Sequence, residues 1–268
     1  MTNLEKTLLL FKKIILQPQS LKQLIDYDAI YHQHLQKKYN LDKLQTVDIQ
    51  ALLPNFNETI HHYTFLDGTS LAIDIALLKA LARQFSPCHY LELGSWRGES
   101  LANVAEIAEH CTSISFADAD LKRLGFDAEM VRLNRFFSKN LPNVTHIGHN
   151  TRTFDYASLD QKFDLIFVDA DHSYEAVRDD TKHVFPLLKN EHSMIVWHDY
   201  GYNTEKARTP VLSGILDGLP TDEARKHVYH VSNTLCAIYT RQPIDKAFFK
   251  PAQTLDKAFS IQLSAKKL

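Results

Sequence analysis

"YLELGSWRGES" at residues 90–100 decides the fold, because it joins a short apolar run to two glycines placed four residues apart. The chain has only eight glycines in 268 residues, and Gly94 and Gly98 lie where the apolar run ends and helical spacing begins. Glycine lets the backbone turn sharply and approach a ligand closely. Free amides at the start of the following helix, together with Ser100, could hold a carboxylate or a phosphate. The stretch predicts a strand, a ligand-binding turn and a helix.

Four further short apolar runs follow at intervals that leave room for helices. The five predicted strands lie within residues 88–93, 112–118, 144–149, 163–169 and 193–199. This alternation predicts an α/β fold, a doubly wound Rossmann-like sheet of seven mostly parallel strands with helices on both faces. Residues 226–241 supply the last two strands as a hairpin around Ser232–Asn233, which we expect to form an antiparallel edge.

The segment before the first strand has a different pattern. Residues 1–62 contain no glycine, and their apolar residues recur at helical spacing, so we expect helices there, with Pro18 between the first two. Thr69 or Ser70 is the expected N-cap of a further helix that ends before Pro87.

The charge balance and the cysteines limit the partners and the compartment. A formal net charge of -2 gives no basic footprint for nucleic acid. Cys88, Cys111 and Cys236 are far apart in apolar surroundings, which is neither a disulfide framework nor a zinc pattern. No apolar run is long enough to span a bilayer, and the N-terminus lacks the pattern of a signal peptide. We therefore expect a cytoplasmic protein with a small-molecule partner and without a nucleic-acid or membrane partner.

Acidic residues end three of the predicted strands, at Asp118, Asp169 and Asp199. Asp118 follows Gly94 by 24 residues, a position suited to accept hydrogen bonds from both ribose hydroxyls of an adenosine-type cofactor. "FDLIFVDADHSYEAVRDD" at residues 163–180 ends its apolar run in Asp169, Asp171 and His172. Because ligands of parallel sheets collect beyond the carboxyl ends of the strands, we expect these residues to share one crevice. The spacing E-x-G-x-x-x-G-x-S departs from G-x-G-x-x-G, which weakens an NAD interpretation.

These motifs, together with "FADAD" at 116–120 and "IVWHDYG" at 195–201, resemble those of class I S-adenosylmethionine-dependent methyltransferases. The resemblance covers roughly residues 70–240 and extends to catechol and caffeoyl-CoA O-methyltransferases and to bacterial sugar and antibiotic tailoring enzymes. It implies an N-terminal helical extension at 1–70, an S-adenosylmethionine-binding methyltransferase domain at 71–242 and a basic C-terminal tail at 243–268. The N-terminal helices are also where we would expect any homo-oligomer to form.

The resemblance also implies a set of cofactor contacts. Glu92 and Gly94 would lie along the methionine part, Ser100 would hold its carboxylate, and Asp118 would hold the ribose. His149 and Asn150 would lie near the adenine. The implied cofactor-binding residues are Glu92, Gly94, Ser95, Trp96, Gly98, Ser100, Asp118, His149, Asn150 and Asp169.

The reaction needs an acceptor that has lost its proton, so the site requires a base, a metal, or both. The resembling enzymes place the base three residues after the strand-end aspartate, and this position is His172 here. An imidazole suits this role because it titrates near neutral pH. The alternative role for His172 is a solvated cap of the following helix. The resemblance also implies that Asp169 is the second catalytic residue. A metal would be held by Asp169, His198 and Asp199. Carboxylates suit Mg²⁺, Mn²⁺ or Ca²⁺, whereas the histidine favours Mn²⁺, iron or zinc, or is purely structural.

The function expected from these residues is transfer of a methyl group from S-adenosylmethionine to an oxygen of a small molecule or sugar. A nucleotide-dependent oxidoreductase on a similar sheet, or a non-catalytic cofactor-binding protein, is the alternative. Methylation of nucleic acid is disfavoured by the near-neutral charge and by the lack of an N/D-P-P-Y/F motif where this chain has "HDYG".

Overall fold

The computed structural model describes residues 26–244, 247–248 and 257–267, so the helices expected around Pro18 lie outside the described residues. The first half holds α2 Tyr27–Tyr39, β1 Thr46–Val47, α3 Ile49–Leu52, α4 Ala72–Ala82, β2 His89–Leu93, α5 Glu99–Ala105, β3 His110–Ser115, α6 Asp118–Arg123, α7 Ala128–Leu133 and β4 Val144–Gly148. The second half holds the 3₁₀ turns η2 Thr151–Thr153 and η3 Tyr156–Leu159, then β5 Leu165–Val168, α8 Tyr174–Val184, η4 Phe185–Leu187, β6 Met194–Trp197, α9 Thr209–Gly218, α10 Asp222–Arg225, β7 Val228–Val231, β8 Ala237–Tyr239 and β9 Ala247–Phe248.

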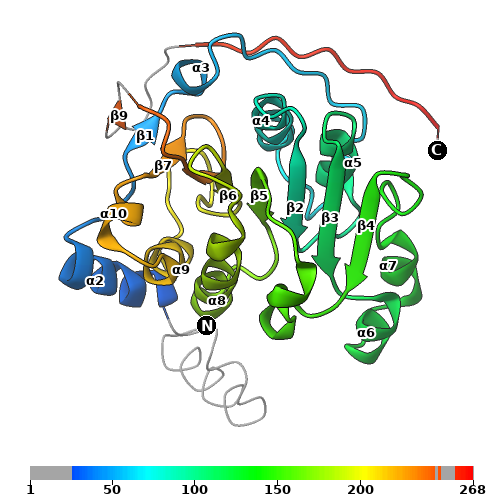
Figure 1. The fold of residues 1–268 in the computed structure, drawn as a ribbon, viewed down its shortest axis with the longest axis horizontal. Helices are drawn as coiled ribbons and strands as arrows, with labels where there is room; N and C mark the ends of the chain where they lie inside the picture. Colours follow the sequence, from blue (N-terminus) through cyan, green and yellow to red (C-terminus); the bar gives the residue numbers. More distant parts are fainter. Residues whose placement is uncertain (1–25, 245–246, 249–256, 268) are drawn as a thin grey trace, which may run out of the picture.

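The strands of the described residues form one sheet in the order β4-β3-β2-β5-β6-β8-β7-β1-β9. β4, β3, β2, β5 and β6 pair in parallel (Figure 1). β8 is antiparallel to both β6 and β7. The chain moves outward from β2 to β4 on one side and returns to β5 on the other, so the strand order reverses between β2 and β5. This order confirms the predicted Rossmann-like fold, in which ligands typically bind beyond the carboxyl ends of the strands at such a reversal point.

The edge of the sheet differs from the prediction. Beyond the predicted hairpin, β1 pairs in parallel with β7, and β9 pairs antiparallel with β1, so the hairpin is not the outer edge. The His230 amide donates to the Gln45 carbonyl (2.8 Å) and the Ser232 amide donates to the Val47 carbonyl (2.9 Å). Two residues are too few to show the alternation by which a strand is recognised in sequence.

Apolar side chains fill both faces of the sheet. Because neighbouring strand residues point to opposite faces, Leu91 and Leu93 join one core and Tyr90 joins the other. α8 and α9 cover the first face, with Leu35 of α2 in the same core, and α3, α4 and α5 cover the second. Helices on both faces were predicted, and the two cores confirm them.

The segment before α4 crosses the glycine-containing loop. The N-cap of α4 is Leu71, not Thr69 or Ser70 as predicted, and the Leu71 amide donates to the side chain of Asp74 (3.0 Å). Thr69 instead accepts a hydrogen bond from Arg97, and Ser70 donates to Asp169 (3.4 Å). Both residues are thereby drawn toward the strand ends.

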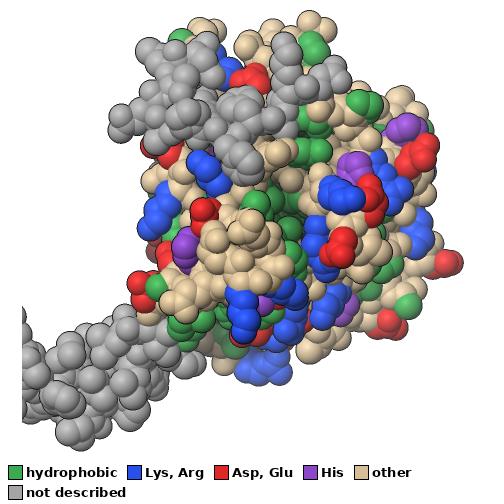
Figure 2. Space-filling model, turned by 90° about the vertical axis from the view of Figure 1, so that its left-hand side faces the viewer, with side chains coloured by type: hydrophobic (Ala, Val, Ile, Leu, Met, Phe, Trp, Pro, Cys, Tyr) green, Lys and Arg blue, Asp and Glu red, His purple; other side chains and the backbone are tan. Residues whose placement is uncertain are grey.

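Acidic and basic side chains are interspersed over the described part of the face in Figure 2. Within the described ranges, no helix combines the length and the apolarity that crossing a membrane requires.

Candidate active site

Gly94 brings the ends of three strands into contact. Its φ of +94° is in the left-handed region, and a Cβ there would lie 2.2 Å from the carbonyl oxygen of Asp169. The Gly94 amide donates to the Ile114 carbonyl and the Asp169 amide donates to the Leu93 carbonyl, each at 2.9 Å. Only glycine therefore fits where the ends of β2, β3 and β5 meet.

The rest of the glycine-containing loop is buried under the segment that follows α7. Gly98 (φ +83°) is the N-cap of α5, and a Cβ there would lie 2.4 Å from the Ser138 hydroxyl. The Trp96 ring is partly buried, and the Arg97 guanidinium lies 4.3 Å from its centroid. Gly68 packs so closely against the ring that an added Cβ would lie 2.8 Å from it. The loop is thus held from two directions by residues distant in sequence.

Glu92 is a buried acid directly before this loop. It is 1% exposed, and the hydroxyls of Tyr90 (2.7 Å) and Ser100 (3.0 Å) donate to its carboxylate. Burial raises the pKa of Glu92 to about 7, although these two hydrogen bonds oppose the increase. Ser95, the next predicted cofactor residue, is also buried. Ser100, expected to face a cofactor carboxylate, here donates to Glu92.

Asp118 is exposed at the position predicted for a ribose contact. β3 ends at Ser115, so Asp118 does not end the strand as predicted but is the first residue of α6, which follows after a two-residue turn. The side-chain amide of Asn134 donates to Asp118 Oδ1 at 2.7 Å. The carboxylate is therefore held by a neighbour while remaining accessible to a ligand.

His149 and Asn150 follow β4 directly and are exposed. The His149 amide donates to the Ser115 carbonyl (2.9 Å), which keeps this turn beside the end of β3. Asn150 is the N-cap of η2, because its side-chain oxygen accepts from the Arg152 amide at 3.0 Å. Both residues therefore lie at the carboxyl end of β4, next to the end of β3.

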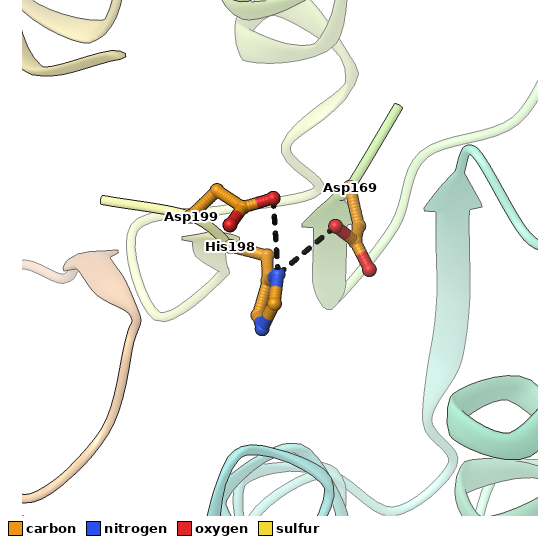
Figure 3. A group of neighbouring side chains, drawn as sticks. All are labelled: Asp169, His198 and Asp199. Carbon is orange, nitrogen blue, oxygen red and sulfur yellow. Dashed lines mark ion pairs between the residues drawn. The ribbon is translucent and has the colours of Figure 1, made fainter. Parts of the chain in front are cut away.

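Three side chains at the ends of β5 and β6 converge (Figure 3). His198 Nδ1 lies 3.1 Å from Asp169 Oδ1 and 3.5 Å from Asp199 Oδ2. One ligand atom from each of the three residues can be chosen so that all lie within 4.8 Å of one another. These residues, with His172, line a small pocket.

The imidazole of His198 is almost completely buried. Its Nε2 lies 3.1 Å from Asp74 Oδ2, while Nδ1 faces the two carboxylates without the alignment of a hydrogen bond to either. Burial lowers the pKa of His198, but the negative charge of Asp169 and the close carboxylates of Asp169, Asp199 and Asp74 raise it well above its ordinary value. A buried nitrogen that faces two carboxylates fits a divalent cation with nitrogen and oxygen ligands.

Asp199 and His172 complete this end of the site. Asp199 has a φ of +55°, a conformation that aspartate tolerates better than most residues, and Arg208 lies 3.3 Å from its Oδ1. Burial raises the pKa of Asp199, but His198, Arg208 and His172 together hold it below its ordinary value. His172 is 62% exposed, with Nδ1 3.6 Å from Asp199 Oδ2. The side chain that accepts a backbone amide at the start of α8 is Asp171, not His172.

Sequence reasoning missed two residues of this site, Ser70 and Asp74. Asp74 carries a recognisable signal, since it is the single acid within the apolar run "LAIDIALLKALA" of α4. A buried acid in such a run needs donors from elsewhere in the fold. Ser70 carries no signal, because its contact with Asp169 depends on how the segment before α4 crosses the sheet.

Residues 91–200 match the family model of a methyltransferase domain. No curated protein matches the chain significantly. A cofactor-bound protein from MTB is 17% identical, covering 66% of this chain and 84% of that chain at a TM-score of 0.48. The O-methyltransferase TomG from Streptomyces achromogenes, involved in tomaymycin synthesis and bound to SAM, is 16% identical, covering 65% and 82% at 0.42. An O-methyltransferase from Bacillus cereus in complex with SAH is 16% identical, covering 84% and 95% at 0.43.

The family match begins inside β2 and ends three residues after β6, so it contains the glycine-containing loop and all three residues of Figure 3. It does not favour the oxidoreductase or the non-catalytic alternative. Residues 91–200, which carry the strand-end motifs, are therefore similar to a methyltransferase domain, the enzyme class that these motifs predict.

Proposed function

We propose that this chain is an S-adenosylmethionine-dependent methyltransferase that methylates a hydroxyl oxygen of a small-molecule acceptor, with help from a divalent cation at Asp169, His198 and Asp199. The observation that carries the proposal is the buried Nδ1 of His198, which lies 3.1 Å and 3.5 Å from two carboxylate oxygens without an aligned hydrogen bond. These groups lie beside the Gly94 turn, since Gly94 contacts the backbone of Asp169. A metal there would be next to the methionine end of the cofactor.

The cofactor contacts follow from the same crevice. We assign the ribose to Asp118, because it is exposed and held by Asn134. The methionine part is assigned to the turn around Gly94, Ser95, Trp96 and Gly98, between Glu92 and Ser100. His149 and Asn150, exposed after β4, are assigned to the adenine.

The chemistry requires the acceptor oxygen to be deprotonated as it attacks the methyl carbon. The carbon–oxygen bond forms while the carbon–sulfur bond breaks, and the sulfur keeps the electron pair of the broken bond. A divalent cation, when bound, lowers the pKa of an acceptor hydroxyl. His172 is assigned the role of base, because its exposed ring lies beside Asp199 at the mouth of the pocket. Asp169 contributes its carboxylate to the cation site, and its backbone contacts Gly94.

Calorimetric titration tests the proposal without a known acceptor. We expect the wild type to bind S-adenosylmethionine and Mn²⁺, and Asp118→Ala to bind the cofactor about tenfold or more weakly while binding Mn²⁺ normally. Asp169→Asn combined with Asp199→Asn is expected to lose Mn²⁺ binding. A wild type that binds no divalent cation would exclude metal assistance, and cofactor binding unaffected by Asp118→Ala would exclude the ribose assignment.

A further inference from the structure

Asp74 is a completely buried carboxylate at the start of α4, and three segments donate to it. The Leu71 amide donates to Oδ2 at 3.0 Å, and the Leu235 amide, from the turn between β7 and β8, donates to Oδ1 at 2.9 Å. His198 Nε2 lies 3.1 Å from Oδ2. Asp74 therefore joins α4, the β7–β8 turn and the end of β6 at one point beneath the pocket.

This contact determines which nitrogen of His198 faces the pocket. An ionised carboxylate only accepts hydrogen bonds, so Nε2 must carry the hydrogen. Nδ1 is the remaining ring nitrogen, and it lies on the side of Asp169 and Asp199 (Figure 3). A histidine that binds a metal through one nitrogen commonly donates from the other to a carboxylate, which fixes the ring and raises its basicity as a ligand.

We propose that Asp74 is the positioning residue that makes His198 Nδ1 a metal ligand, and that the site consequently prefers cations that accept imidazole, such as Mn²⁺ or Zn²⁺, over Mg²⁺ and Ca²⁺. This inference rests on the metal-assisted function proposed above. Asp74 touches neither the cofactor nor the acceptor in this account, because the His198 ring separates it from the pocket. Its amide contacts also stabilise the fold, so the test needs a measurement that a structural role alone would not change.

The matched control is Asp164→Asn. Asp164 is also buried, accepts from the His89 amide (2.9 Å) and pairs with Lys189 (3.1 Å), but it lies at the amino end of β5, opposite to the carboxyl end that carries Asp169. A general effect of replacing a buried acid should appear in both variants, whereas an effect on His198 should appear only at Asp74.

The test measures cation affinity by calorimetry for the wild type, Asp74→Asn and Asp164→Asn. We expect Mn²⁺ affinity to fall about 10- to 100-fold in Asp74→Asn and to stay unchanged in Asp164→Asn. We also expect the wild type to bind Mn²⁺ more tightly than Mg²⁺ and this preference to decrease in Asp74→Asn. Equal Mn²⁺ affinity in the wild type and Asp74→Asn would overturn the inference about Asp74 but would leave the metal-assisted function standing. A wild type that binds no cation would overturn the metal-assisted function and this inference with it.

¹⁵N nuclear magnetic resonance of the wild type with Zn²⁺ gives a second test that does not require Asp74→Asn to fold. The His198 ring is expected to show a metal-bound Nδ1 and a protonated Nε2. Zn²⁺ bound through Nε2, or a His198 spectrum unchanged by Zn²⁺, would overturn the inference.

Discussion

Glu92→Gln is expected to make the protein more stable than the wild type at alkaline pH and to change it little at acidic pH. Glu92 is buried, and its carboxylate accepts from Tyr90 and Ser100. Burial raises its pKa from an ordinary 4.5 to about 7. Glutamine keeps the shape and an accepting oxygen but does not ionise.

The sign and size follow from the two pKa values. Between pH 4.5 and about 7 the folded state retains a proton that the unfolded state has lost, so the wild type loses stability as the pH rises through this window. The full pKa difference corresponds to about 3 kcal/mol. The unfolding free energy of Glu92→Gln, relative to the wild type, should therefore increase by about 2–3 kcal/mol from pH 5 to pH 8.

Urea unfolding of the wild type and Glu92→Gln at both pH values measures this difference. Glu129→Gln on α7 is the control, because the Glu129 side chain is 77% exposed and its exchange shows the effect of replacing a surface acid by an amide. The reasoning is refuted if the difference between Glu92→Gln and the wild type is the same at pH 5 and pH 8.

Three further variants test other parts of the account. Gly94→Ala should lower the unfolding free energy by about 1–3 kcal/mol and weaken S-adenosylmethionine binding, which calorimetry measures. The control Gly125→Ala, with a φ of +87° and no atom within 4 Å of the added Cβ, should affect only stability. Normal cofactor binding by Gly94→Ala would contradict this expectation. His172→Ala should slow methyl transfer about 10²- to 10⁴-fold at unchanged cofactor affinity, and a rate within about twofold of the wild type would exclude the base. Asp217 contacts His34 (2.9 Å) and accepts from Lys38 (2.8 Å), Tyr39 and Tyr174 (2.7 Å). Burial raises the pKa of Asp217, but Lys38, Tyr39 and Tyr174 hold it well below its ordinary value. Asp217→Asn should therefore make α2 more sensitive to proteolysis at pH 7, with the difference from the wild type shrinking only below about pH 4; equal cleavage at pH 7 would contradict this.

The parallel part of the sheet could be predicted because buried parallel strands are continuous apolar runs with acids at their ends. The predicted ends of β2, β4, β5 and β6 lie within two residues of the observed ones. Asp118 is the exception among the strand ends. The chain leaves β3 early and begins α6, whose N-cap amide donates to Asp120 (3.4 Å), and local pattern does not reveal this.

Contacts between distant segments could not be predicted. Asp74 and His198 are 124 residues apart, and β1 pairs with a strand more than 180 residues later. His198 itself was predicted as a candidate ligand from its position after β6. The orientation of its ring was not predictable, because it depends on α4 packing across the sheet. The domain limits and the roles of the site residues stay predictions.

A crystal structure of the wild type with S-adenosylhomocysteine and Mn²⁺ tests the central claim most directly. We expect the adenosine between Asp118 and the Gly94 turn, and Mn²⁺ bonded to His198 Nδ1, Asp169 and Asp199. S-adenosylhomocysteine bound elsewhere on the sheet, or Mn²⁺ absent from these three side chains, would contradict it.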